Sequence, residues 1–513
     1  MQNEYLLLVR RSPNEKYRNP SSITWTFKRR VLNPSILGII WGTTIDSESN
    51  AFLDEVVVRI RSYLEGKANV NDFIPQSSLR KTSDLSLPLE GLGLENALAD
   101  IDYFLKHSVK TNQPGFMNPL WGGVNIAAFA GEVIATLANN SMYTYELSPM
   151  ATLIEQALIK RMCEMVGFTD GNGTLTSGGS NSNMIGMLCA RYIADPLGQQ
   201  RGFDSGKLVS FVSEESHYSV LMAANVLGIG FDNVVKVPCD SDGRMRVDKL
   251  EEEISRSRVN GQIPFCVVAT SGTTVRGAFD PLREIAEICS NQNIWLHVDA
   301  AWGGSCLFSN KLRALMDGVE LADSVCWDPH KMMGVPLVCS AFLIKKPEIL
   351  RKICSHGNVA HYLFLGDAED VDLGRTSLQC GRRNDALKLF LSWREKGDAG
   401  WARLVENYIA LADYLQTRVE NHPNLEMMST RQWSNVCIRY TAESIDHDEI
   451  NSTLRDRLVK SGNFMISQSN IRENTILRPV IANPSVCKET IDDLVDEITR
   501  IGEDIVRGIP FSN

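Results

Sequence analysis

Residues 264–300 read PFCVVATSGTTVRGAFDPLREIAEICSNQNIWLHVDA, and this stretch decides the fold class. It opens and closes with short apolar runs, at 265–270 and 294–299, which are typical of buried strands. The segment 281–291 between them carries apolar residues at helical spacing. A strand, a helix and a second strand in this order predict two parallel strands joined by a crossover helix.

The same alternation extends in both directions along the chain. Further strands are predicted at 174–176, 208–212, 234–237, 324–327 and 339–344, with helices at 245–257 and in a stretch that ends at Gly167. Such alternation predicts an α/β fold with a mostly parallel central sheet that helices cover on both faces. Ligands of these folds bind where the strands end and the loops converge.

The pattern changes on both sides of this region. Near the C-terminus, helices at 385–396, 400–418 and 488–506 and strands at 435–440 and 475–480 predict a smaller α+β domain. Near the N-terminus, one amphipathic helix at 51–64 and a Pro- and Ser-containing connection indicate an arm. We therefore divide the chain into a basic segment at 1–45, an arm at 46–94, a large domain at 95–390 and a small domain at 391–513.

Composition and charge argue against several classes of protein. Of the 513 residues, 43% are hydrophobic and 22% charged, as in ordinary globular chains. The longest apolar run, 36–41, is far shorter than the ~20 residues of a membrane helix, so we expect no membrane partner. The net charge of −10 argues against a nucleic-acid partner. Residues 1–44 carry seven Lys or Arg and two Glu but no apolar core before a cleavage site, so a disordered basic arm is favoured over a targeting peptide.

The cysteines and histidines argue against a metal site. None of the twelve cysteines forms a CxxC pair, and several lie in apolar runs, as Cys266 and Cys326 do. The eight histidines are not spaced as metal ligands. Buried, reduced thiols are typical of a reducing compartment, so we expect a cytoplasmic protein without a structural metal.

Three segments at predicted strand ends carry side chains that suit one cofactor. The loop TSGGSNSN, residues 176–183, joins a strand to a helix, where glycines allow an anion to approach the free N–H groups of the helix. Asp299 ends the strand 294–299. Lys331 follows 32 residues later between apolar side chains, where partial desolvation is expected to lower the pKa of its amine and free it for attack on a carbonyl.

Taken singly, each feature has an ordinary explanation. The loop can be a polar turn, Asp299 can cap a helix, and the aliphatic part of Lys331 can lie on an apolar surface. In this order, however, a phosphate-binding loop, a carboxylate for a ring nitrogen and a lysine for a Schiff base are what pyridoxal phosphate requires. His217, just beyond a strand, is placed to stack on the pyridine ring. Thr270 ends a strand at the same edge of the predicted sheet.

Several motifs extend this picture. They are NSMYTYELSP at 140–149, SHYS at 216–219, HVDA at 297–300, DPHKMMGV at 328–335 and LQCGRR at 378–383. Together with the loop at 177, they resemble the group II pyridoxal-phosphate decarboxylases, particularly glutamate and cysteine sulfinate decarboxylases, over residues 95–510.

The resemblance implies an aspartate-aminotransferase-like fold and a homodimer with active sites at the interface. It implies an enzyme that converts an acidic L-amino acid (glutamate, cysteine sulfinate, aspartate or cysteate) to an amine and carbon dioxide. Lys331 would form the Schiff base, Asp299 would pair with the ring nitrogen, and His217 would stack on the ring. The resemblance places Ser177, Gly178, Gly179 and His330 near the phosphate, and it assigns the substrate α-carboxylate to Arg478.

Three positions depart from the family pattern. Asp328 stands where family members often have Asn, and its carboxylate would repel a nearby phosphate unless it is protonated or turned away. Asn118-Pro119 replaces an Asn-Gln pair, so Asn118 remains a substrate-binding candidate while the preference for glutamate does not transfer. The segment 365–374 is shorter than the family's mobile loop and lacks the Tyr thought to protonate the intermediate; His361, Tyr362 or a residue of the partner subunit is a substitute candidate.

Two other interpretations stay open. The same cofactor supports decarboxylation coupled to oxidative deamination, other lyase chemistry and transamination. A regulatory or scaffold protein that binds the cofactor without turnover is the least favoured, because Lys331, Asp299 and His217 are all present.

Overall fold

The computed structural model describes the strands at 5–8 and 27–30 and residues 45–203, 207–355, 364, 371–443 and 445–511. Contacts divide it into two compact units. The first comprises residues 1–66 and 76–108, and the second comprises residues 67–75 and 109–513. Most of the predicted basic segment therefore lies outside the described residues, as do His361 and Tyr362 and positions 365–370 of the shortened loop.

The first unit is mainly helical. Its elements are α2 Ser47–Glu65, α3 Gln76–Thr82, α4 Gly93–His107 and the antiparallel strands β1 Tyr5–Leu8 and β2 Phe27–Arg30. The helix predicted at 51–64 corresponds to α2, which starts earlier because the Asp46 side chain accepts a hydrogen bond from the Ser49 backbone N–H at 2.7 Å. The Arg59 guanidinium on α2 donates to both Asp102 carboxylate oxygens on α4, at 2.7 and 2.9 Å.

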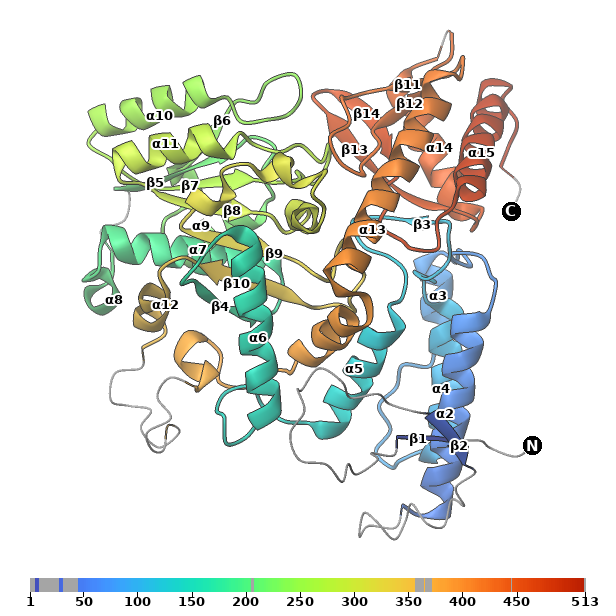
Figure 1. The fold of residues 1–513 in the computed structure, drawn as a ribbon. Helices are drawn as coiled ribbons and strands as arrows, with labels where there is room; N and C mark the ends of the chain where they lie inside the picture. The colour runs from blue at the N-terminus through green and yellow to red at the C-terminus, as the bar shows by residue number, and fades with distance from the viewer. Residues whose placement is uncertain are drawn as a thin grey trace. The chain divides into compact units, whose positions relative to one another are not determined.

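A seven-stranded sheet forms the centre of the second unit (Figure 1). Its order is β4-β10-β9-β8-β7-β5-β6, and all neighbouring pairs are parallel except those made by β10. The strands are β4 Asn172–Thr176, β5 Leu208–Ser213, β6 Val234–Val237, β7 Ile263–Thr270, β8 Trp295–Asp299, β9 Ser324–Trp327 and β10 Ser340–Ile344. The predicted mostly parallel sheet is confirmed.

Helices cover both faces of this sheet (Figure 1). Side chains along β7 alternate between two cores, with Val267 and Ala269 in one and Cys266 and Val268 in the other. The helices of this region are α5 Ile126–Ala138, α6 Pro149–Val166, α7 Gly179–Ala194, α8 Gly198–Arg201, α9 Ser219–Val226, α10 Val247–Val259, α11 Leu282–Gln292 and α12 Pro347–Ile353. Short 3₁₀ helices lie at Phe231–Asn233, Gly303–Phe308, Arg313–Met316, Val319–Leu321 and Leu373–Thr376.

A smaller five-stranded sheet, ordered β11-β12-β14-β13-β3, follows the predicted α+β pattern. Its strands are β3 Phe116–Met117, β11 Leu425–Met427, β12 Ile438–Tyr440, β13 Met465–Ile471 and β14 Asn474–Arg478. Helices α13 Ala386–Glu420, α14 His447–Lys460 and α15 Lys488–Val506 complete it. The two helices predicted at 385–396 and 400–418 form α13, which Gly397 interrupts with a φ of 61°.

Candidate active site

One cavity of about 220 Å³ lies where the ends of β4, β5, β7, β8 and β9 converge. It is lined by every residue that we predicted to bind the cofactor except Ser177, namely Gly178, Gly179, His217, Thr270, Asp299, His330 and Lys331. These residues come from five loops and strand ends that are far apart in the sequence. The fold therefore brings the predicted constellation to a single place.

Three predicted site residues do not line the cavity. Ser177 is exposed in the loop directly before it. Asn118 is half-buried just after β3. Arg478 ends β14 and is buried; its Nε donates to Ser467 Oγ at 2.8 Å and its Nη1 donates to the Thr274 carbonyl. Thr274 itself lines the cavity, so Arg478 contacts a residue of the cavity wall but not the cavity itself.

The Asp299 carboxylate is the end point of a buried chain of hydrogen bonds. Its Oδ1 accepts from the Ala301 backbone N–H at 3.1 Å, and its Oδ2 accepts from Asn183 Nδ2 at 2.8 Å. The Asn183 Oδ1 in turn lies 3.0 Å from His297 Nε2. Since an amide oxygen only accepts, His297 must carry its proton on Nε2.

The hydrogen bonds on the other side of the His297 ring agree with a proton on Nε2. His297 Nδ1 lies 2.8 Å from Ser324 Oγ, which accepts from Trp295 Nε1 at 3.0 Å and thus keeps its own proton for the imidazole. Burial lowers the pKa of His297 to about 4, so the ring is neutral at pH 7. This series of hydrogen bonds therefore orients the Asn183 side chain so that its N–H group points at Asp299.

Sequence reasoning missed Asn183 and His297. Two signals in the sequence mark them: His297 lies two residues before Asp299 on the same face of β8, and Asn183 lies one turn after Gly179 in α7. Neither signal indicates that the two side chains meet.

Lys331 is half-buried, and its Nζ lies 3.4 Å from Asp328 Oδ2. Burial alone would lower the pKa of this amine, as we expected from the sequence. The neighbouring carboxylates of Asp328 and Asp299 outweigh burial and hold the pKa of Lys331 above its usual value. The expectation of a lowered pKa was therefore wrong, because it took no account of two acidic side chains that the fold places beside the lysine.

The two histidines of the cavity are neutral at pH 7. Burial lowers the pKa of His217, although Asp299 opposes this, and it likewise lowers the pKa of His330. His217 Nδ1 accepts from the Ser219 backbone N–H at 3.3 Å, which orients the ring next to the start of α9.

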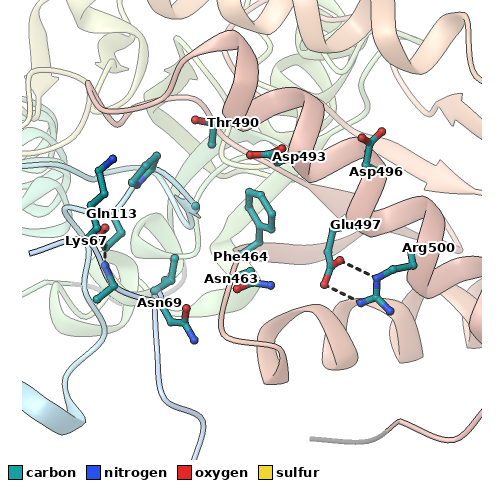
Figure 2. Close-up of a pocket in the computed structure, with 14 residues that line it drawn as sticks. Lys67, Asn69, Gln113, Asn463, Phe464, Thr490, Asp493, Asp496, Glu497 and Arg500 are labelled. Carbon is teal, nitrogen blue, oxygen red and sulfur yellow. Dashed lines mark hydrogen bonds and ion pairs between the residues drawn. The ribbon is translucent and has the colours of Figure 1, made fainter.

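A larger cavity, of about 680 Å³, lies elsewhere in the second unit (Figure 2). Its lining comes from residues 67–70, 113–115 and 463–464 and from α15. Its charged groups are three acidic and two basic side chains, and its Arg500 guanidinium donates to both Glu497 carboxylate oxygens, at 2.9 and 3.0 Å. None of the predicted site residues lines it, so size alone does not mark the reactive site.

Comparison with known proteins identifies the family. The model of the pyridoxal-dependent decarboxylase conserved domain matches residues 75–441. The chain belongs to the pyridoxal-dependent decarboxylase family. This decarboxylase is 37% identical over 489 residues to acidic amino acid decarboxylase GADL1 of Xenopus tropicalis, covering 91% of this chain and 96% of that protein. It is 40% identical over 443 residues to human cysteine sulfinic acid decarboxylase, covering 83% and 90%.

Solved structures agree with this assignment. Mouse CSAD in its apo form superposes with a TM-score of 0.85 at 36% identity, over 88% of this chain and 98% of that one. The decarboxylase is therefore a carboxy-lyase with the aspartate-aminotransferase-like fold, and its cofactor is pyridoxal phosphate.

The lining of the cavity fits this cofactor. Thr270 Oγ1 is buried and has no hydrogen-bond partner within the described part of the chain, which leaves a polar atom free for a ligand. Gly178, with a φ of 125°, precedes the first turn of α7, where backbone N–H groups have no helical partner. Within the described ranges, no helix of this decarboxylase is long and apolar enough to span a bilayer, and no group of three or more His, Cys, Asp or Glu side chains could hold a metal ion.

Proposed function

We propose that this decarboxylase acts on a small acidic L-amino acid, such as glutamate, cysteine sulfinate, aspartate or cysteate, and releases the amine and carbon dioxide. The observation that carries the proposal is that Lys331 and Asp299 line one cavity whose rim residue Thr274 holds a buried arginine. The substrate class is supported by relatives named as acidic amino acid and cysteine sulfinic acid decarboxylases.

Each side chain has a distinct part in this proposal. Lys331 holds the cofactor covalently, and Asp299 keeps a proton on the ring nitrogen while Asn183 fixes the carboxylate. His217 stacks on the ring, and His330 and the N–H groups at the start of α7 bind the phosphate. When bound, the cofactor draws electron density from the α-carbon of an attached amino acid. Arg478, which Thr274 separates from the cavity, is our candidate for binding the α-carboxylate of the substrate, and Asn118 remains a candidate for the other end of the substrate.

The proton that completes the reaction must come from a group other than a loop Tyr, since residues 365–374 contain none. Protonation of the substrate carbon gives the amine, which we favour as the main product. His361 and Tyr362 are candidate acids, and both lie outside the described residues. Interception by oxygen would instead release an aldehyde and ammonia.

One assay separates these outcomes. The protein is incubated with glutamate, aspartate, cysteine sulfinate and cysteate in turn, while carbon dioxide, amine, ammonia and dissolved oxygen are measured. We expect equal amounts of amine and carbon dioxide without oxygen uptake. Lys331→Ala should abolish turnover, whereas Lys160→Ala, at an exposed position of α6, should not. Steady ammonia release with oxygen consumption would replace the proposal by an oxidative one.

We also propose that the active form is a homodimer. Helix α5 has the sequence IAAFAGEVIATLA, yet Ala128, Gly131 and Ala135 are its only buried residues. Large apolar side chains exposed together on one face of a helix are typical of an interaction surface. Ile126 and Leu137 are 59% and 79% exposed, and we propose that a second copy of this chain covers them.

Leu137→Arg should lower the fraction of dimer in analytical ultracentrifugation, whereas Val259→Arg on α10 should not. A wild-type monomer with full activity would contradict the proposal.

A cytoplasmic location remains part of the proposal. Nine of the twelve cysteines are buried, and none of the twelve forms a disulfide. Such thiols persist in a reducing compartment. Fluorescent tagging and fractionation of the source cells would test the location.

A further inference from the structure

Asp328 is a buried carboxylate in the wall of the cofactor cavity. It directly follows β9 and is 2% exposed. Its Oδ2 lies 3.4 Å from Lys331 Nζ and 3.6 Å from His330 Nε2. A methyl group added to Gly179 would lie 2.6 Å from the same oxygen, so the carboxylate packs directly against the first residue of α7.

The cofactor phosphate and Asp328 therefore compete for the same surroundings. The first turn of α7 is the phosphate site in the proposed function, on which this inference rests. A phosphate monoester carries close to two negative charges above pH ~6. With the cofactor bound, the Lys331 nitrogen would be held in the link to it, and the Asp328 carboxylate and the phosphate would lie close together in a buried site.

The other titratable groups around Asp328 do not relieve this repulsion at neutral pH. Burial lowers the pKa values of His330 and His217, so both rings are neutral. Cys326 Sγ lies 3.8 Å from Asp328 Oδ1, and burial holds the pKa of this thiol far above its usual value. Like charges this close cannot both remain ionised at no cost, and uptake of one proton removes the conflict.

We propose that Asp328 takes up one proton from solvent when pyridoxal phosphate binds, and that the resulting carboxylic acid donates a hydrogen bond to the phosphate. One O–H bond forms on Asp328 and no other bond is broken in this step. The consequence is a cofactor affinity that depends on pH. Above pH ~6 each bound cofactor requires a proton from solvent, so the dissociation constant should rise by up to about tenfold per pH unit.

The first experiment uses the unmodified chain. The apoprotein is mixed in weak buffer at pH 8 with pyridoxal phosphate or with pyridoxal, and proton uptake is read from an indicator dye. Because pyridoxal forms the same link to Lys331 but lacks the phosphate, the difference isolates the phosphate. We expect about one additional proton for the phosphorylated cofactor. Equal uptake by the two compounds would overturn the inference, whereas a failure of both to bind would refute the proposed site itself.

The second experiment assigns the proton. The dissociation constant of pyridoxal phosphate is measured by quenching of protein fluorescence between pH 6.5 and 8.5 for the wild type, Asp328→Asn and Asp323→Asn. Asp323 flanks the other end of β9, outside the cavity, and is the matched control. Asp328→Asn should bind at least tenfold more tightly than wild type at pH 8, with little pH dependence, whereas Asp323→Asn should follow the wild type. Weaker binding by Asp328→Asn, or undiminished proton uptake, would contradict the assignment.

Discussion

Replacement of Gly186 by Ala tests how closely the cofactor site depends on its supporting hydrogen bonds. Gly186 lies inside α7, where this helix crosses the imidazole of His297. A methyl group at this position would lie 2.5 Å from Nδ1, 2.7 Å from Cε1 and 2.8 Å from Cγ of the ring. A Cβ atom essentially never lies this close to an atom to which it is not bonded, and a planar ring cannot bend aside, so either α7 or His297 must move.

The opposing energies decide the sign of the effect. In a helix interior, Ala is favoured over Gly by about 1 kcal/mol. Against this, overpacking a filled core costs ~1–3 kcal/mol. A shifted imidazole also weakens the contacts with Ser324 and Asn183, and each buried polar group left without a partner costs ~1–3 kcal/mol. We therefore expect Gly186→Ala to lower the free energy of unfolding by about 2 kcal/mol.

Thermal unfolding followed by circular dichroism measures this change, and His297→Ala provides the partner for a double-mutant cycle. Removal of the ring makes room for the new methyl group, so the double variant should be more stable than the two single changes predict, by about 1–3 kcal/mol. Carbon dioxide release by the Gly186→Ala variant should also fall, because Asn183 no longer orients Asp299. A rise in the midpoint of unfolding, or additive effects of the two changes, would refute the reasoning.

Three further expectations follow from the same site. Lowering the pH from 7 to 5 should lower the free energy of unfolding by about 2 kcal/mol through His297, because its pKa of about 4 in the folded protein lies below the ~6.5 of the unfolded chain. Protonation therefore favours the unfolded chain, and stability is lost as the pH falls through this window. Calorimetry of His297→Phe should not show this loss. Asp299→Asn should keep bound cofactor, seen in its visible absorbance, yet lose at least ~100-fold in carbon dioxide release; near-normal turnover would exclude Asp299 as the ring partner. Arg478→Lys should raise KM about tenfold or more for acidic and neutral amino acids alike, since one ammonium group cannot copy a two-point contact; an effect on acidic substrates alone would assign Arg478 to the distal group.

Local signals in the sequence predicted several of the elements and most of the residues that line the cofactor cavity. The apolar runs at 234–237 and 324–327 coincide with β6 and β9, and the helix predicted at 488–506 coincides with α15. These segments are readable because apolar periodicity is a property of neighbouring residues. In the same way, Lys331 and Asp299 stand out because each follows a buried strand, and strand ends are where ligands bind in such sheets.

Tertiary structure alone decided which distant segments meet. Strand β3 has only two residues, and its pairing with β13 some 350 positions later leaves no local trace. The reversed direction of β10 likewise depends on its partners β4 and β9. His297 could not be joined to Asn183 before α7 was placed across β8, and the raised pKa of Lys331 required the positions of two carboxylates. Hydrogen bonds and electrostatic interactions act over a few ångströms in space, whereas a sequence orders residues only along the chain.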